Sequence, residues 1–173
     1  MTCEQVNPGL WQLRFPEHEA AFIVHVLAQL GRHYEQDIGK LPPALRAYWQ
    51  GSIGSGETSD AKGLQEEQEM LAEARADLRS DRLAMVETWI SEYELAKKLD
   101  PWEVALTGAE RDEFVAMLND RRMQIALELG VTEADMDADA EAIPEDKRRH
   151  GILEIDVLGH FILATLGPQI YRP

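Results

Sequence analysis

The segment that most constrains the fold is the last apolar stretch of the chain, GILEIDVLGHFILATL, which spans Gly151 to Leu166. Its large apolar side chains recur at helical spacing and point in nearly every direction around the helix axis. These side chains are Ile152, Ile155, Val157, Leu158, Phe161, Ile162, Leu163 and Leu166. A helix that is apolar on most sides belongs in the middle of a bundle. We therefore expect a buried C-terminal helix that ends at Gly167 and Pro168.

Two helices and one strand are predicted in the first part of the chain. Apolar residues at helical spacing predict a first helix from Pro16 to about Ile38. A short helix from Ala44 to Gln50 follows the Pro42-Pro43 pair. The preceding LWQLRF, Leu10 to Phe15, alternates apolar and polar residues, which is typical of a short strand or an extended segment.

The middle of the chain also has helical spacing. Residues 60–98 are predicted to form two helices that divide near Ser80, or equally one long bent helix. Thr107 and Glu110 form a capping box that opens a further helix, which ends at Gly130. The sequence thus predicts an all-α fold, a compact multi-helix bundle with a buried C-terminal helix and at most one short N-terminal strand.

The 173 residues fit a single helical domain, 1–173. A mobile loop is expected at 51–59, which is rich in Gly and Ser, and an exposed acidic insertion is expected at 132–149. Cys3 is the sole cysteine, so no internal disulfide can form. The first residues lack the basic start and apolar core of a signal peptide, and no apolar stretch reaches the length of a membrane span, so we expect a cytoplasmic protein.

The net charge of the chain disfavours two classes of binding partner. With 32 acidic and 17 basic residues, the net charge is −15. This charge repels the phosphates of nucleic acid and of anionic lipids, so we expect neither nucleic acid nor a membrane as partner.

The acidic insertion contains Asp135, Asp137 and Asp139 at alternate positions, which is the opening spacing of a calcium-binding EF-hand loop. The later positions depart from that pattern: Ala140 replaces the glycine, Pro144 follows, and Asp146 replaces the glutamate. A solvated acidic loop is therefore the preferred interpretation, and we expect neither a bound metal nor another cofactor.

Two groups of polar residues lie within the predicted core helices. Asp156 and His160 are four residues apart, so their side chains can meet on one side of the last helix. Asn119, Asp120 and Arg122 interrupt an apolar helix at positions that partly face inward, where charged groups must find partners or reach water. Pairing of Arg122 with Asp156 is the preferred interpretation, as a tie between two helices; a ligand or partner site is the alternative.

Several motifs resemble a known family. Three segments resemble the bacterial domain-of-unknown-function family twenty-seventeen. They are the opening PEHEAAFIVHVLAQL, the central LNDRRMQIALELGVTEADMD and the closing IDVLGHFILATL. The resemblance covers Pro16 to Leu166, apart from a longer acidic connection at Thr132 to Arg149. It implies no known activity, but genes of this family often lie near that of the Clp protease adaptor ClpS in actinobacteria, which implies a link to protein turnover. The motif positions carried onto this chain are Asn119, Asp120, Arg122, Asp156 and Gly159.

Known catalytic signatures are missing from the sequence. It has no nucleophile elbow and no phosphate-binding loop motif. We therefore expect a non-enzymatic interaction or regulatory protein with a protein partner that the sequence does not identify, and self-association stays open. The alternative is an enzyme or a protein that binds a small ligand or a metal through a polar cluster inside the bundle, drawn from Asn119, Arg122, Asp156 and His160.

Overall fold

The structure is a computed structural model that describes residues 1–50, 61–96, 101–136 and 146–167, with the backbone alone for 61–65, 67 and 68. The predicted mobile loop, Asp137 and Asp139 lie outside the described residues. In the described residues the elements are β1 (Thr2–Asn7), β2 (Leu10–Phe15), α1 (Glu17–Glu35), the 3-10 helix η1 (Ile38–Lys40), α2 (Pro43–Gln50), α3 (Ala61–Ala96), β3 (Trp102–Thr107), α4 (Gly108–Leu129), α5 (Glu133–Met136) and α6 (Asp146–Leu166).

The fold is mostly helical, but it also contains a sheet, so the predicted all-α class is wrong and the molecule is α+β. The three strands form an antiparallel sheet in the order β1-β2-β3. The predicted strand LWQLRF is the central strand β2, and it pairs with β3 along its whole length, from Leu10 opposite Thr107 to Phe15 opposite Trp102. β3 has a strict alternation of buried and exposed residues, because one face of the sheet packs on the helices.

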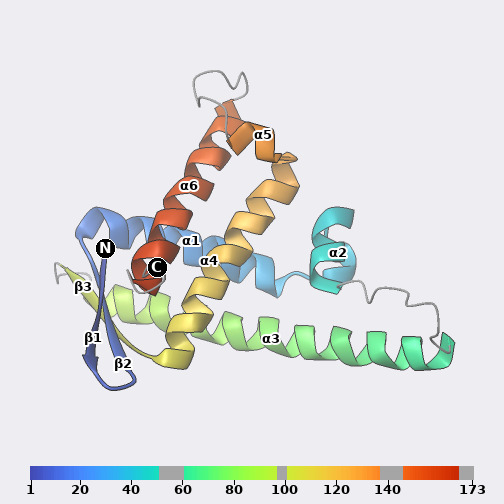
Figure 1. Cartoon of the computed structure of the whole chain (residues 1–173), viewed down its shortest axis with the longest axis horizontal. Coiled ribbons are helices and arrows are strands. Elements are labelled where there is room, and N and C mark those ends of the chain that lie inside the picture. Colours follow the sequence, from blue (N-terminus) through green and yellow to red (C-terminus); the bar gives the residue numbers. More distant parts are fainter. Residues whose placement is uncertain (51–60, 97–100, 137–145, 168–173) are drawn as a thin grey trace, which may run out of the picture.

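The helices meet around a common core. Figure 1 shows α3 along the base of the molecule, the sheet at one end of it, and α4 and α6 rising as an antiparallel pair that meets near α5. α1 packs along α3, and α4 packs along α6. The core contains aromatic rings from each layer, among them Phe15 of β2, Trp102 of β3 and Phe114 of α4.

Two local predictions about helix ends are confirmed. The hydroxyl of Thr107 accepts a hydrogen bond from the Glu110 N–H at 3.2 Å, and the Glu110 carboxylate accepts one from the Thr107 N–H at 2.7 Å. Gly130 ends α4 in the left-handed conformation, with φ of 60°. α3 is one helix of 36 residues. Ser80 does not start a new helix, and Arg79 and Arg82 on either side of it are buried.

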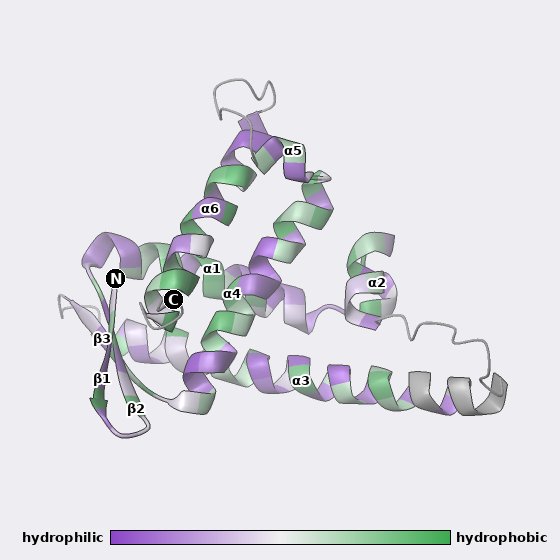
Figure 2. Cartoon of the chain, viewed as in Figure 1, coloured by the Kyte–Doolittle hydropathy of each residue, from purple (hydrophilic) through white to green (hydrophobic). Residues whose placement is uncertain are grey.

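α6 forms where it was expected, but it is not enclosed. One side packs inward through Ile152, Ile155, Leu158 and Phe161. The other side leaves Leu153, Val157 and Leu163 exposed at 45%, 40% and 58% of their surface. Figure 2 shows apolar residues on much of α6, although α6 lies at the edge of the helical layer. The prediction of a wholly buried helix is therefore wrong, because α6 is covered by α4 and β1 rather than surrounded. In the described residues, no helix is long and apolar enough to cross a membrane.

Candidate functional site

Asp120 of α4 is the centre of a buried polar cluster. One carboxylate oxygen accepts a hydrogen bond from the Tyr34 hydroxyl at 2.7 Å and an ion-paired one from Arg82 Nη1 at 2.6 Å. The other oxygen accepts a hydrogen bond from the Tyr48 hydroxyl at 2.8 Å. Arg82 also donates to Glu113 through Nε at 2.9 Å. Tyr34, Tyr48 and Arg82 come from α1, α2 and α3, whereas Asp120 and Glu113 lie on α4. We name these five residues the Asp120 cluster.

The electrostatics of the Asp120 cluster keep its tyrosines protonated. Burial, followed by the neighbouring Asp120 carboxylate, raises the pKa of Tyr34 far above its usual value. The same two causes raise the pKa of Tyr48. Both hydroxyls are therefore hydrogen-bond donors at neutral pH, and neither is a base or a nucleophile.

A second buried arginine caps the C-terminal end of α1. Arg79 of α3 donates through Nη2 to the backbone carbonyls of His33, Tyr34 and Gln36, at 2.5, 3.1 and 2.8 Å. Its Cζ also lies 5.1 Å from the centre of the Trp49 ring. A cation at this position stabilises the C-terminus of α1, where unpaired carbonyls carry partial negative charge.

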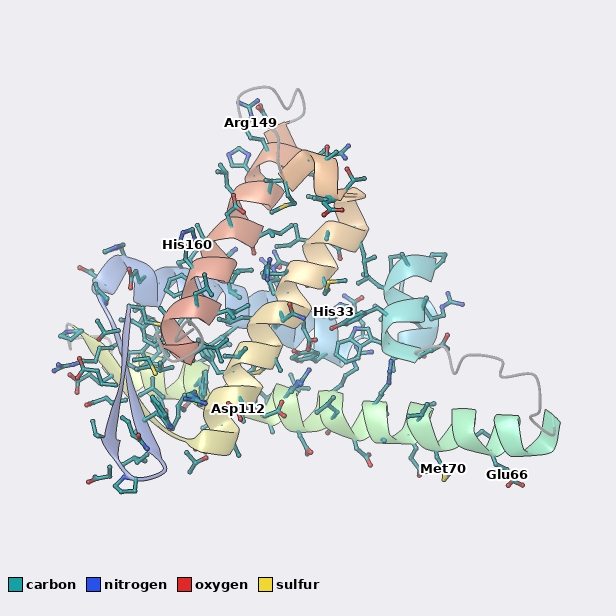
Figure 3. All side chains as sticks on the ribbon, viewed as in Figure 1. His33, Glu66, Met70, Asp112, Arg149 and His160 are labelled. Carbon is teal, nitrogen blue, oxygen red and sulfur yellow. The ribbon has the colours of Figure 1, made fainter. Side chains whose placement is uncertain are left out.

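His33 is buried next to this arginine. Its Nε2 accepts a hydrogen bond from the Trp49 indole N–H at 2.9 Å. Burial, followed by the positive charge of Arg79, lowers the pKa of His33. The ring is therefore neutral at neutral pH, and its Nε2 lone pair is occupied, so His33 supplies no metal ligand through that atom. Figure 3 places His33 in the interior, between α1 and α2.

The Asp120 cluster is suited to holding helices together rather than to chemistry. Asp120 is 4% exposed, and three donors occupy its two carboxylate oxygens. Such a network stabilises a unique arrangement when each member is paired. The sequence predicted an inward polar position at Asp120 but missed its partners. The visible signal was two arginines, Arg79 and Arg82, between the partly buried residues Leu78 and Leu83.

Asp156 and His160 are not brought together with Arg122. The preferred pairing of Arg122 with Asp156 is not formed, and the arginine of α4 that pairs with α6 is Arg121, which donates to Glu154 at 2.8 Å. Asp156 and His160 are both exposed, contrary to the expectation of a buried pair. The His160 Nδ1 lies 2.9 Å from the backbone carbonyl of Asp156.

Asn119 and Arg122 instead line a hollow of about 270 Å³ between α4, α5 and α6. We call it the Arg122 hollow. Its walls also include Met123, Met136 and Ile155. The Nε of Arg122 is buried and has no hydrogen-bond partner in the described part of the chain. The Cζ of Arg122 lies 4.0 Å from the place that a Cβ on Gly159 would occupy, so the side chain crosses α6 where α6 has no side chain.

Asp135, the first of the weak metal candidates, has its carboxylate occupied by the protein. One oxygen accepts hydrogen bonds from the N–H and hydroxyl of Thr132, at 2.7 and 2.6 Å, and an ion-paired one from Arg148 at 2.5 Å. The bonds from Thr132 and then Arg148 lower the pKa of Asp135 to about 2. Among the described residues no group of three or more His, Cys, Asp or Glu side chains is placed to hold a metal ion.

A larger groove, of about 510 Å³, runs between the first turns of α1 and the second half of α6. Phe22 of α1 and Phe161 of α6 stack at its base, with ring centres 5.8 Å apart. Val157 and His160 of α6 form one wall, and Figure 3 shows His160 on the outer side of α6 above α1. We call this feature the α1/α6 groove; the sequence indicated α6 but not that α6 would be half open.

We compared the chain with models of protein families, with curated proteins and with solved structures, and found no match in any of the three. The resemblance to family twenty-seventeen therefore stays a prediction.

Proposed function

We propose that this protein is a non-enzymatic interaction module, whose α1/α6 groove binds an apolar segment of a basic protein partner. The observation that carries the proposal is the exposed apolar side of α6. Leu153, Val157 and Ala164 lie within one narrow stripe of this helix, because they are separated by four and seven residues. The stripe runs directly into the groove, whose lining includes Val157 and Ala164.

Charge indicates the kind of partner. Two copies of a chain with a net charge of −15 repel each other, which disfavours self-association through this surface. A segment with Lys or Arg beside its apolar residues is attracted instead, since Asp156 and Glu17 are exposed near the stripe and the groove. The link to protein turnover is part of this proposal only through the family resemblance.

The test uses three designed amphipathic helical peptides that share one apolar face and carry net charges of +4, 0 and −4. We expect the cationic peptide to bind most tightly in fluorescence anisotropy and to weaken as salt is added. Replacing Leu153 and Val157 together by Ser removes exposed apolar side chains, and we expect about tenfold weaker binding.

The matched control replaces Met70 and Leu71 of α3 by Ser, because these neighbouring apolar side chains are exposed at 62% and 38%. Figure 3 shows Met70 toward the end of α3 that points away from the groove. Equal binding of the three peptides, or an equal loss in the control variant, would contradict the proposal. So would sedimentation showing a dimer that the Leu153 and Val157 changes dissociate, because the occupant would then be a second copy.

A further inference from the structure

Arg122 has no partner among the residues that the structure describes. Each of the other arginines that the structure describes donates to a carboxylate or a backbone carbonyl. Arg122 makes neither a hydrogen bond nor an ion pair within the described part of the chain, and its Nε is buried. The contrast is strong in a chain where acidic residues outnumber basic ones by 32 to 17. A partly buried guanidinium without an acceptor is costly, and an anion beside it would remove that cost.

The space beside Arg122 has the character of a small ligand site. Met123, Ala126, Val131, Met136 and Ile155 supply apolar walls, and Asn119 adds an amide that can donate a second hydrogen bond. Methionine side chains adapt their shape to what they contact. A volume of 270 Å³ holds about nine non-hydrogen atoms, at about 30 Å³ for each atom, which is the share of a water molecule in the liquid.

We propose that the Arg122 hollow binds a monocarboxylate with a short branched apolar group. The carboxylate accepts paired hydrogen bonds from the guanidinium of Arg122, which matches it in shape, and one from the amide of Asn119. The apolar group packs against Met123, Met136 and Ile155. The same chemistry is offered by a free branched-chain acid and by the last residue of a polypeptide, which ends in a carboxylate.

Charge restricts the ligand to a single negative charge. Glu133 of α5 is exposed and lines the same hollow, so a second negative charge on the ligand would be repelled. The net charge of −15 also opposes polyanions such as nucleotides. The hollow shares no lining residue with the α1/α6 groove, so this inference does not depend on the proposed function.

The experiment follows methyl signals of the full chain labelled with ¹³C at methionine. The chain has six methionines, which include Met123 and Met136 in the hollow and Met85 and Met117 elsewhere. We expect 4-methylpentanoate to shift the signals of Met123 and Met136 in a saturable manner and to leave those of Met85 and Met117 in place. The uncharged 4-methylpentanamide, which has the same shape, should produce no saturable shift up to the same concentration.

Two variants test the roles of single side chains. Arg122→Gln should weaken 4-methylpentanoate about tenfold or more, because it removes a charge-assisted hydrogen-bond pair. Arg121→Gln is the matched control, because Arg121 is the adjacent arginine but is bound to Glu154; its affinity should equal that of the wild type. Glu133→Gln should bind about two- to fivefold more tightly, since it removes a nearby negative charge.

The two sources of the carboxylate are separated with acetyl-Gly-Leu, offered with a free C-terminus and as the C-terminal amide. Binding of the free-ended peptide with an affinity above that of 4-methylpentanoate assigns the site to polypeptide ends, and weaker binding assigns it to free acids. The inference is wrong if the acid and its amide shift the methionine signals equally, if neither does so, or if Arg122→Gln binds as tightly as Arg121→Gln.

Discussion

Asp120 and Arg122 lie two residues apart on α4 but face opposite surroundings. Asp120 is 4% exposed, and its two oxygens accept bonds from three side chains of three other helices. Arg122 points toward α6, crosses it at Gly159, and finds no acceptor within the described residues. Both residues interrupt an apolar helix, so the sequence alone cannot distinguish them. The difference teaches that a polar residue must be judged by its partners and not by its position in a helical pattern. A residue whose groups are all paired holds the structure together, whereas one without partners is a candidate binding residue.

The largest expected effect tests the structural half of this comparison. Asp120→Asn removes the negative charge that pairs with Arg82. It also replaces one of the two oxygens that accept hydrogen bonds from Tyr34, Tyr48 and Arg82 by an amide that donates. We expect the free energy of unfolding, measured by tryptophan fluorescence in urea, to fall by about 3 to 5 kcal/mol. On the other side of the comparison, Arg122→Gln removes an unpaired charge, so it should leave the free energy of unfolding unchanged or raise it by up to about 1 kcal/mol.

The matched control for the charge change is Asp112→Asn on the same helix. The Asp112 carboxylate is 69% exposed and pairs only with the adjacent Arg111 in the described structure, so its loss should cost about 0.5 kcal/mol or less. The contrast between Asp120 and Arg122 would be lost if Asp120→Asn lowered the free energy of unfolding as little as Asp112→Asn does. The Asp120 cluster would then add nothing to stability.

A second, smaller effect is expected at alkaline pH. Tyr34 and Tyr48 have raised pKa values in the folded protein, so above pH 10 the unfolded chain loses these protons while the folded chain keeps them. Stability therefore falls as pH rises, by up to about 1.4 kcal/mol per pH unit for each tyrosine. The double variant Tyr34→Phe and Tyr48→Phe, measured by urea unfolding from pH 9 to 11, should show a shallower fall than the wild type.

The control for the alkaline effect is Tyr93→Phe, because Tyr93 lies outside the Asp120 cluster. It is near the C-terminal end of α3 and packs on Trp102. We expect this variant to retain the steep loss of stability. If the double variant and the wild type lose stability equally as pH rises, the pKa values of the two hydroxyls are not raised in the folded protein.

The smallest effect concerns the contact between α4 and α6. A Cβ added at Gly151 would lie 2.3 Å from a Leu129 methyl and 3.0 Å from an Ile125 methyl, whereas at Gly159 the first contact is Arg122 at 4.0 Å. Gly151→Ala should therefore be less stable than Gly159→Ala by about 1 to 2 kcal/mol in urea unfolding. Both variants gain the same helix propensity, but only Gly151→Ala must displace packed side chains. Equal stabilities would show that α6 is held as loosely at Gly151 as at the Arg122 crossing.

Local features of the fold could be predicted because their causes are local. The capping box of Thr107 and Glu110, the end of α4 at Gly130 and the strand LWQLRF each depend on residues within a few positions of one another. The sheet as a whole could not be predicted in this way. β1 is mostly exposed and lacks a clear alternation, and it forms a strand because β2 offers it backbone partners.

The candidate site was predicted less completely than the helices. Asn119, Asp120 and Arg122 were recognised as polar interruptions, but Tyr34, Tyr48 and Arg82 were missed because they are far away in the sequence and look like ordinary surface or core residues. Asp156 and His160 were assigned to the interior because α6 is rich in apolar residues. Composition cannot tell how many sides of a helix receive neighbours.

What the sequence by itself determined is where the helices lie and how most of them end, because spacing of apolar residues and capping groups act within a few turns of the chain. The tertiary structure decided which side of α6 stays open and which charge is paired. It joined Asp120 to Arg82 across 38 residues and left Arg122 facing a hollow. The physical reason is that burial and pairing depend on the three-dimensional neighbours of a side chain, and a single helix carries no information about them.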